Sequence, residues 1–415
     1  TNHLDPPQDN GYFSIGLRGG YGTITNETTG SIIGGNAAAV AIQGLSNSLI
    51  NEGSITTTGQ FGVLAAGEDN TITNSGTIEG GQNLSSLEEI QFIPLKAGIG
   101  ILGNNNEVIN KDGGTVSSST SSIHDGSTGI LIYGTGNEIR NNSGGTITGG
   151  EFGVYIADGA NTIINSGDIL SGKHGIMIQD GASSVVTNDG HITADNGYGV
   201  FIGSGSDNTS ITNTGSISGG RGGIDAVGQG ITITNETDGS IFVNDGGEHP
   251  WMGEGGSLYA LGLGGIDGTI VNRGTITGGN VAAIGLGGTG NQIENEGEIT
   301  TSGLYGVGIQ GDENTVTNSG TISGSHAGIG FMGNSNVLTN SGTITDASGN
   351  SYGVEIIGDS NVVTNDSPGT IYGSVSGIVI SGDSNEVTND GNIEGGSYGV
   401  YAVGVSNEIT NQGSG

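Results

Sequence analysis

Short alternating groups of apolar and polar residues recur along the whole chain. One group ends at an Asn, as in VTN at residues 316–318, and the next has the form Asn-x-Gly-x-Ile. A third has the form Gly-[Val/Ile]-x-[Ile/Phe/Ala], as in GVEI at residues 353–356. Apolar residues at every second position are typical of β-strands, and the Gly, Asn, Ser and Asp residues between the groups form turns. The pattern predicts three short strands per repeat and no helix.

The Asn that ends the first group sets the length of the repeat. It occurs sixteen times, and twelve of the fifteen spacings between its copies are 22 to 25 residues, the others being 36, 31 and 37. A fixed period in this range indicates a solenoid. These anchor residues are Asn26, Asn51, Asn74, Asn110, Asn141, Asn165, Asn188, Asn213, Asn235, Asn272, Asn295, Asn318, Asn340, Asn365, Asn389 and Asn411.

Equivalent residues recur once per repeat and are not mirrored about turns, which argues against hairpins. Each strand is therefore expected to pair in parallel with its equivalent in the next coil, about 4.8 Å away. The Ile and Val side chains would then stack into a continuous core. We predict an all-β, single-domain parallel β-helix of about sixteen three-strand coils, one per anchor Asn.

The recurrent Asn and Gly residues have a structural explanation. Stacked Asn side chains can hydrogen-bond along the axis of a solenoid and satisfy turn backbone. A second Asn, four residues before the anchor, is expected to form a similar row. Turn glycines such as Gly320 are expected to need positive φ. A structural ladder is predicted at the anchors, including Asn74, Asn165, Asn318, Asn340 and Asn389.

Composition narrows the classes of partner. Lys and Arg total 7 and Asp and Glu total 41, giving a net charge of -34. This charge repels nucleic acid and anionic membranes, so neither is expected as a partner. The absence of Cys excludes disulfides and thiolate metal sites. No apolar run approaches membrane-spanning length, so no membrane insertion is expected.

Units such as TNSGTISG at residues 317–324, joined to GV-x-I segments, resemble the passenger domains of Gram-negative autotransporters. The resemblance covers essentially Gly11 to Gly413. It implies a right-handed β-helix that is secreted to the bacterial cell surface, which suits a chain without Cys. Passenger domains include adhesins, toxins and proteases, so the resemblance alone does not select a function.

The repeat also defines the expected organisation of the chain. An N-terminal segment is predicted over residues 1–12 and the β-helix over 13–415, with insertions at 82–96 and 243–258. Both ends interrupt a coil, which favours a truncated piece over protection of the ends or end-to-end stacking. The second insertion holds the only Trp, and long insertions on solenoids often carry binding. Its predicted binding tip is His249, Trp251 and Met252, with simple packing onto the β-helix as the alternative.

A second predicted binding surface lies at the outward position of the Gly-[Val/Ile]-x group. Four successive coils place apolar residues there, and such a ridge often marks an interface. Further along, the same position holds Gly262, Gly285, Gly308 and Gly330, which would leave a bare strip. Loops covering both features are the alternative. The ridge residues are Leu131, Tyr155, Met177 and Phe201.

Aromatic residues or His precede the Gly of the same group on many coils. Aromatic faces can stack on sugars, and packing at a corner of the coil is the alternative. The positions are Phe13, Phe61, Phe152, His174, Tyr198, Tyr259, Tyr305, Tyr352 and Tyr398.

Catalysis has little support in the sequence. Glycoside hydrolysis needs two carboxylates at a defined separation, whereas the strand carboxylates Asp168, Asp225, Glu298 and Glu355 fall on distant coils. No H-E-x-x-H motif occurs, and Gly-x-Ser-x-Gly is missing from a strand-turn-helix context. The chain is therefore expected not to be an enzyme and to need no metal or cofactor.

Calcium is the weaker alternative to a protein without metal. Turns of sequence GDEN at Gly311 and GDSN at Gly358 and Gly382 offer oxygen ligands. They do not match the G-G-x-G-x-D calcium repeat, and turn chemistry alone explains Asp and Asn there.

The sequence favours an extracellular bacterial surface protein, an adhesin that binds a host-cell protein, matrix or glycan through loops and one exposed flank. The second hypothesis is a structural subunit that self-associates into a surface layer or filament. A polysaccharide-active β-helix comes third.

Overall fold

The structure is a computed structural model and describes residues 12–81, 96–118, 126–244, 258–347, 349 and 351–412. These residues form strands and no helix. The described part of the chain therefore contains no helix that could span a membrane. The chain divides into two compact units, Thr1–Ser210 and Ile211–Gly415, each described by itself. The boundary falls within β23 (Ser210–Asn213).

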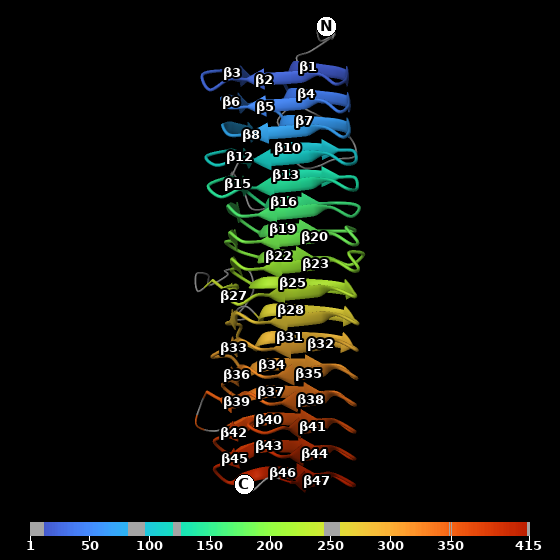
Figure 1. Cartoon of the computed structure of the whole chain (residues 1–415), viewed down its shortest axis with the longest axis vertical. Helices are drawn as coiled ribbons and strands as arrows, with labels where there is room; N and C mark the ends of the chain where they lie inside the picture. The colour runs from blue at the N-terminus through green and yellow to red at the C-terminus, as the bar shows by residue number, and fades with distance from the viewer. Residues whose placement is uncertain are drawn as a thin grey trace. The chain divides into compact units, whose positions relative to one another are not determined.

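Unit 1 is a parallel β-helix with three sheets, and every third strand along the chain belongs to the same sheet (Figure 1). Sheet A contains β1 (Phe13–Gly20), β4 (Ala38–Leu45), β7 (Phe61–Glu68), β10 (Lys96–Leu102), β13 (Ser127–Tyr133), β16 (Phe152–Ile156), β19 (His174–Ile178) and β22 (Tyr198–Ile202). Sheet B contains β2 (Thr23–Asn26), β5 (Ser48–Asn51), β8 (Thr71–Asn74), β11 (Glu107–Asn110), β14 (Glu138–Asn141), β17 (Thr162–Asn165) and β20 (Val185–Asn188). Sheet C contains β3 (Ser31–Ile33), β6 (Ser54–Thr56), β9 (Thr77–Gly80), β12 (Thr115–Ser118), β15 (Thr146–Gly149), β18 (Asp168–Ser171) and β21 (His191–Ala194).

Unit 2 repeats this arrangement. Sheet A contains β25 (Gly222–Gln229), β28 (Tyr259–Ile266), β31 (Ala282–Thr289), β34 (Tyr305–Gln310), β37 (Ala327–Met332), β40 (Tyr352–Ile357), β43 (Ser376–Ser381) and β46 (Tyr398–Val403). Sheet B contains β26 (Thr232–Asn235), β29 (Thr269–Asn272), β32 (Gln292–Asn295), β35 (Thr315–Asn318), β38 (Val337–Asn340), β41 (Val362–Asn365), β44 (Glu386–Asn389) and β47 (Glu408–Asn411). Sheet C contains β24 (Ser216–Gly219), β27 (Ser240–Val243), β30 (Thr275–Thr277), β33 (Glu298–Thr300), β36 (Thr321–Gly324), β39 (Thr343–Asp346), β42 (Thr370–Gly373) and β45 (Asn392–Gly395).

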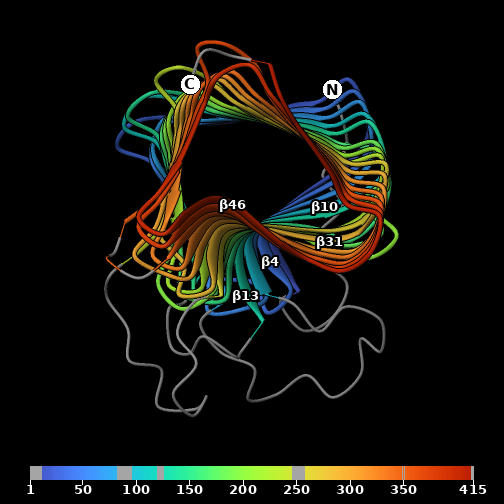
Figure 2. The same ribbon diagram turned by 90° about the horizontal axis from the view of Figure 1, so that it is seen from below.

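The core of each unit is a stack of inward-facing Ile, Val and Leu side chains. In unit 2, β34 pairs with β37 in register, so that Val307 lies beside Ile329 and both side chains are fully buried. Figure 2 looks along the stacked coils and shows the three sides that enclose this interior. The predicted all-β, right-handed parallel β-helix is thereby confirmed.

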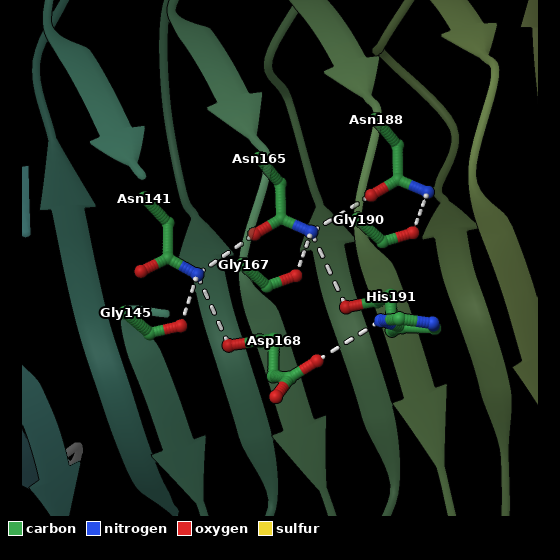
Figure 3. A network of polar contacts seen from close by, with 8 residues as sticks. All are labelled: Asn141, Gly145, Asn165, Gly167, Asp168, Asn188, Gly190 and His191. Carbon is green, nitrogen blue, oxygen red and sulfur yellow. Dashed lines mark hydrogen bonds and ion pairs between the residues drawn. The ribbon is translucent and has the colours of Figure 1, made fainter. Parts of the chain in front are cut away.

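The anchor Asn residues form a hydrogen-bonded ladder on the inner edge of sheet B. The Asn141 amide donates from Nδ2 to Asn165 Oδ1 (2.8 Å), and Asn165 donates in the same way to Asn188 (2.7 Å; Figure 3). Asn165 Nδ2 also donates to the carbonyls of Gly167 and His191, at 3.0 and 3.2 Å. One side chain thus holds its own turn, the next Asn and the next coil together.

The same bonds occur at the other predicted ladder residues. Asn74, Asn318, Asn340 and Asn389 each donate from Nδ2 to the Oδ1 of the next anchor, at 2.7 to 2.9 Å. A second ladder runs along the residue four positions before the anchor, as in the bond from Asn336 Nδ2 to Asn361 Oδ1 (3.1 Å).

The expectation of positive φ at turn glycines holds at some turns and is wrong at the turn of Gly320. Gly320 is not among the residues with positive φ, but a Cβ there would lie 2.1 Å from the carbonyl oxygen of Gly297 on the preceding coil. The glycine is required because two backbones approach closely, not because of its own dihedral angle. Positive φ occurs at a different turn, as at Gly311 (φ 146°) and Gly382 (φ 155°).

The ladder generates a stability prediction. Asn318→Ala should destabilise unit 2 by about 1–3 kcal/mol, because the buried Asn340 Oδ1 would lose its donor and the carbonyls of Gly320 and Thr343 would each lose one hydrogen bond. Urea denaturation followed by circular dichroism would measure the loss. Thr317→Ala, at the exposed neighbouring position, is the control and should cost little. Equal losses of unfolding free energy in the two variants would contradict a stabilising role of the Asn ladder.

Candidate binding surface

The outer face of sheet A carries several aromatic side chains. On β16 the strand begins with Phe152, the residue before the Gly of the Gly-[Val/Ile]-x group, and Tyr155, at the x position of that group, follows three residues later. Phe152 and Tyr155 on β16 show the result: Phe152 is buried, Tyr155 is partly exposed, and their ring centroids lie 5.2 Å apart. Two rows of side chains thus lie next to each other at this strand, although strict alternation would place residues three apart on opposite faces.

Unit 1 builds an aromatic stack from the first of these rows. Phe152, His174 and Tyr198 lie on three successive strands with nearly parallel rings, at centroid distances of 6.0 and 5.9 Å. Phe201 lies 5.1 Å from His174 and 5.9 Å from Tyr198, so the second row packs against the first. Phe152 and His174 are buried, as the alternative of packing at a corner of the coil predicts. Tyr198 is partly exposed.

The structure brings the four predicted ridge residues into one row. Leu131 is paired in register with Tyr155, Tyr155 with Met177, and Met177 with Phe201. Tyr155, Met177 and Phe201 are partly exposed. Leu131 corrects the expectation of an exposed ridge of four, because it is fully buried in a cluster with Ala38, Phe61 and Ala97.

Polar groups border the exposed part of this ridge. The Tyr155 hydroxyl donates to Gln179 Oε1 (3.0 Å), and burial, followed by the charges of nearby groups, raises the pKa of this tyrosine. Lys173 Nζ donates to Glu151 Oε1 at 2.7 Å and lies 5.5 Å from the centre of the Phe152 ring. The surface thus combines apolar area with hydrogen-bonding groups.

The prediction of a bare glycine strip in unit 2 is correct for the alignment of the glycines and wrong for their exposure. The four glycines do align, but all are buried because tyrosine rings lie over them. A Cβ at Gly285 would lie 2.4 Å from Tyr259 Cδ1, and one at Gly330 would lie 2.5 Å from Tyr305 Cε1. Ala282 and Ala327 flank Tyr305 in its own row, which leaves room for the ring.

The strip ends at a polar cluster that the sequence did not reveal. Glu355 follows Gly330 in the outward row of sheet A. Its Oε2 accepts a hydrogen bond from the Tyr305 hydroxyl (2.8 Å) and lies 3.1 Å from His326 Nε2. The His326 ring is nearly perpendicular to the rings of Tyr305 and Tyr352, at 5.5 and 5.4 Å. The only signals in the sequence are the alternation of Tyr with Ala and the Glu that ends the run of glycines.

The cluster shifts the titration of its tyrosine. Burial is the main cause that raises the pKa of Tyr305, and the hydrogen bond to Glu355 and the charge of that carboxylate raise it further. Both effects disfavour the phenolate. Tyr305 is therefore a hydrogen-bond donor that fixes one oxygen of Glu355.

The strand carboxylates do not form a hydrolytic pair in this part of the structure. The neighbours of Glu355 in its row are Gly330 and Val379. Asp168 lies on sheet C and pairs with His191 on the adjacent strand, at 3.1 Å (Figure 3). Asp225 has Gly262 as its partner in register on sheet A, and Glu298 lies on sheet C.

The turn aspartates considered for calcium bond to the backbone. Asp312 Oδ1 accepts from the Asn334 N–H (2.7 Å), Asp359 Oδ1 from the Asp383 N–H, and Asp383 Oδ1 from the Val405 N–H. Among the described residues there is no group of three or more His, Asp or Glu side chains that could hold a metal ion.

The predicted tip lies outside the described residues. This applies to His249, Trp251 and Met252 and to most of both insertions. The described edges show that Lys96 begins β10 and Val243 ends β27, so these two residues belong to strands and not to insertions.

Comparison with protein families supports a β-helical class. The family model described as the BigA third pectate lyase-like domain matches residues 19–247, more than half of the chain. Comparison with curated proteins and with solved structures gave no match.

The tyrosine over the glycine strip can be tested by steric substitution. Gly330→Ala should destabilise unit 2 by about 1–3 kcal/mol, because the new methyl group must displace the Tyr305 ring. Thermal denaturation measures the change. Gly287→Ala on β31, where a Cβ would meet no atom closer than 4.0 Å, is the matched control. In a Tyr305→Ala background the cost of Gly330→Ala should fall; an undiminished cost would locate the clash elsewhere.

The raised pKa of Tyr305 predicts a pH dependence of stability. Tyrosine in an unfolded chain titrates near pH 10. Above that pH the unfolded state releases its proton while the folded state keeps it, so the free energy of unfolding should fall as pH rises. Tyr305→Phe should reduce this fall. The difference in tyrosinate absorbance between wild type and variant should appear at a higher pH than the absorbance of a free tyrosine. A difference that appears at the pH of a free tyrosine would contradict the raised pKa of Tyr305.

Proposed function

The chain belongs to the family of the BigA third pectate lyase-like domain, and on this premise we propose that it is a non-enzymatic binding β-helix of a bacterial surface. The finer proposal is an autotransporter-type adhesin passenger, extracellular or secreted. The absence of Cys suits a chain that crosses an oxidising compartment before it folds. The partner would be a host-cell protein, matrix or glycan.

The exposed ridge on sheet A of unit 1 is the observation that supports binding most directly. Tyr155, Met177 and Phe201 form a row of partly exposed large side chains in an otherwise polar, acidic protein. The rings of Tyr155 and Phe201 pack against the stack of Phe152, His174 and Tyr198, which holds both ends of the row in a fixed geometry. A preorganised apolar row with polar groups at its border is the usual anatomy of a protein interface.

The outer side of sheet A in unit 2 supports a binding role over a hydrolytic one. Glu355 is a strand carboxylate on sheet A that is contacted by Tyr305 and His326. The adjacent coils place Gly330 and Val379 beside it in its row, so they offer no second carboxylate there. Two carboxylates are needed for the common mechanisms of glycoside hydrolysis. Binding is proposed to need no metal, because the turn carboxylates of Asp312 and Asp359 accept hydrogen bonds from backbone N–H groups.

The sequence offers a second contact region in the tip of His249, Trp251 and Met252, which stays a prediction. An isolated Trp in a long insertion would act as an anchor for a partner. Self-association into a surface layer or filament is the alternative function for the same ridge.

Binding can be tested on an array of matrix proteins, glycans and fixed cells. Replacing Tyr155, Met177 and Phe201 together with Ser should lower affinity for the captured ligand by about tenfold or more, because buried anchors dominate interface energy. The double variant Leu170→Ser and Val185→Ser is the control, since both residues are exposed and lie on the other two sheets. Trp251→Ala tests the tip separately.

The outcomes separate the alternatives. Unchanged binding in the ridge variant and in Trp251→Ala would contradict both proposed contact regions. Polymerisation of the wild-type chain in dilute buffer, seen by light scattering and lost in the ridge variant, would favour the structural subunit. Release of reducing ends or unsaturated sugars from a polysaccharide panel would overturn the non-enzymatic assignment.

A further inference from the structure

The C-terminal part of unit 2 has an unusual distribution of charge. All seven Lys and Arg residues of the chain lie at or before Arg273, so His326 is the only basic side chain in residues 274–415. The same stretch contains fourteen acidic residues. They are Glu294, Glu296, Glu298, Asp312, Glu313, Asp346, Glu355, Asp359, Asp366, Asp383, Glu386, Asp390, Glu394 and Glu408.

Few of these carboxylates meet a basic group. Among the residues that the structure describes, Glu296 pairs with Arg273 at 3.3 Å and Glu355 lies beside His326 at 3.1 Å. Asp312, Asp359 and Asp383 accept backbone N–H groups instead. These coils therefore carry an uncompensated negative field that would attract a cationic partner.

Glu355 is the one carboxylate in this field that is held in a fixed orientation on sheet A. Tyr305 and His326 both contact its Oε2. No described residue hydrogen-bonds to the other oxygen, Oε1. The side chain is 17% exposed and that of His326 is 36% exposed, so the pair is reachable from solvent. A fixed carboxylate with one free oxygen suits a hydrogen-bond donor that carries positive charge.

Aromatic rings lie beside this carboxylate. Tyr352 is partly exposed and precedes Glu355 by three residues on β40, the same spacing at which the Phe152 and Tyr155 rings are 5.2 Å apart. The His326 ring lies 5.4 Å from that of Tyr352. A cation that bonds to Glu355 would also contact aromatic surface, which is a favourable surrounding for ammonium and guanidinium groups.

We propose that Glu355, flanked by Tyr352 and His326, binds a Lys or Arg side chain of a basic polypeptide partner. The inference deepens the proposed binding function by naming the chemistry of one partner, and it uses a different unit from the apolar ridge. A polypeptide with several cations is favoured over a neutral glycan because the surrounding uncompensated carboxylates would attract each of them. The acidic coils would speed the encounter, and Glu355 would provide the specific contact.

The test uses the full chain and a fluorescent peptide of alternating Lys and Ser, followed by fluorescence anisotropy. Glu355→Gln should weaken binding by about tenfold, because it removes the charge at the contact. Glu298→Gln removes an equal charge from an exposed position on sheet C of the same unit and should change affinity by less than about twofold, as expected for a screened surface charge. Tyr352→Leu is a second variant, and thermal denaturation of each variant checks that it folds.

Three outcomes would overturn the inference. Equal effects of Glu355→Gln and Glu298→Gln would show non-specific attraction between a polyanion and a polycation. Retained binding of a Lys-acetylated peptide would show that the cation is not recognised. Tighter, Glu355-dependent binding of an amino-sugar polymer than of the peptide would assign the site to a polysaccharide.

Failure of this inference is distinguishable from failure of the proposed function. A chain that captures a ligand on the matrix and glycan array but ignores the basic peptide keeps its binding role and loses this site. A chain that captures nothing on either test loses the proposed function itself.

Discussion

The distance between neighbouring coils is the constraint on which the rest of each unit depends. Parallel strands that share backbone hydrogen bonds lie about 4.8 Å apart, and every side chain must fit that repeat. Ile and Val satisfy it by stacking on copies of themselves, as Val307 and Ile329 do. The turn backbones come so close that a Cβ at Gly320 would lie 2.1 Å from the carbonyl oxygen of Gly297. A repeated sequence is the consequence, because each coil must present its neighbours with the same surface.

The Asn ladder makes this spacing favourable as well as sterically allowed. A turn in the interior of a solenoid leaves carbonyl groups without donors, and buried polar groups without partners are costly. One carboxamide donates within its own turn and to the next coil, and it accepts from the coil before, as Asn165 does between Asn141 and Asn188. The bonds all run in one direction along a ladder, so each amide polarises the next.

Aromatic rings on the outer face of sheet A are accommodated in two different ways. In unit 1, Phe152, His174 and Tyr198 follow one another and stack. In unit 2, Tyr305 lies across its neighbours, with Ala282 and Ala327 beside it and glycine below its ring. The first solution leaves a partly exposed ridge, and the second buries the Tyr305 ring and positions Glu355. The two units thus carry different chemistry on equivalent faces of the same fold.

The sequence alone determined the fold, because a period of 22 to 25 residues with three alternating groups leaves few arrangements other than parallel coils. It also determined the ladder residues and the alignment of Leu131, Tyr155, Met177 and Phe201, since register follows directly from the repeat. Exposure was decided by tertiary structure. Leu131 is buried by side chains from other coils, and the glycine strip is covered by Tyr259 and Tyr305. The contact between Tyr305 and Glu355 joins residues fifty positions apart and two coils away, a distance that no pattern within one repeat encodes.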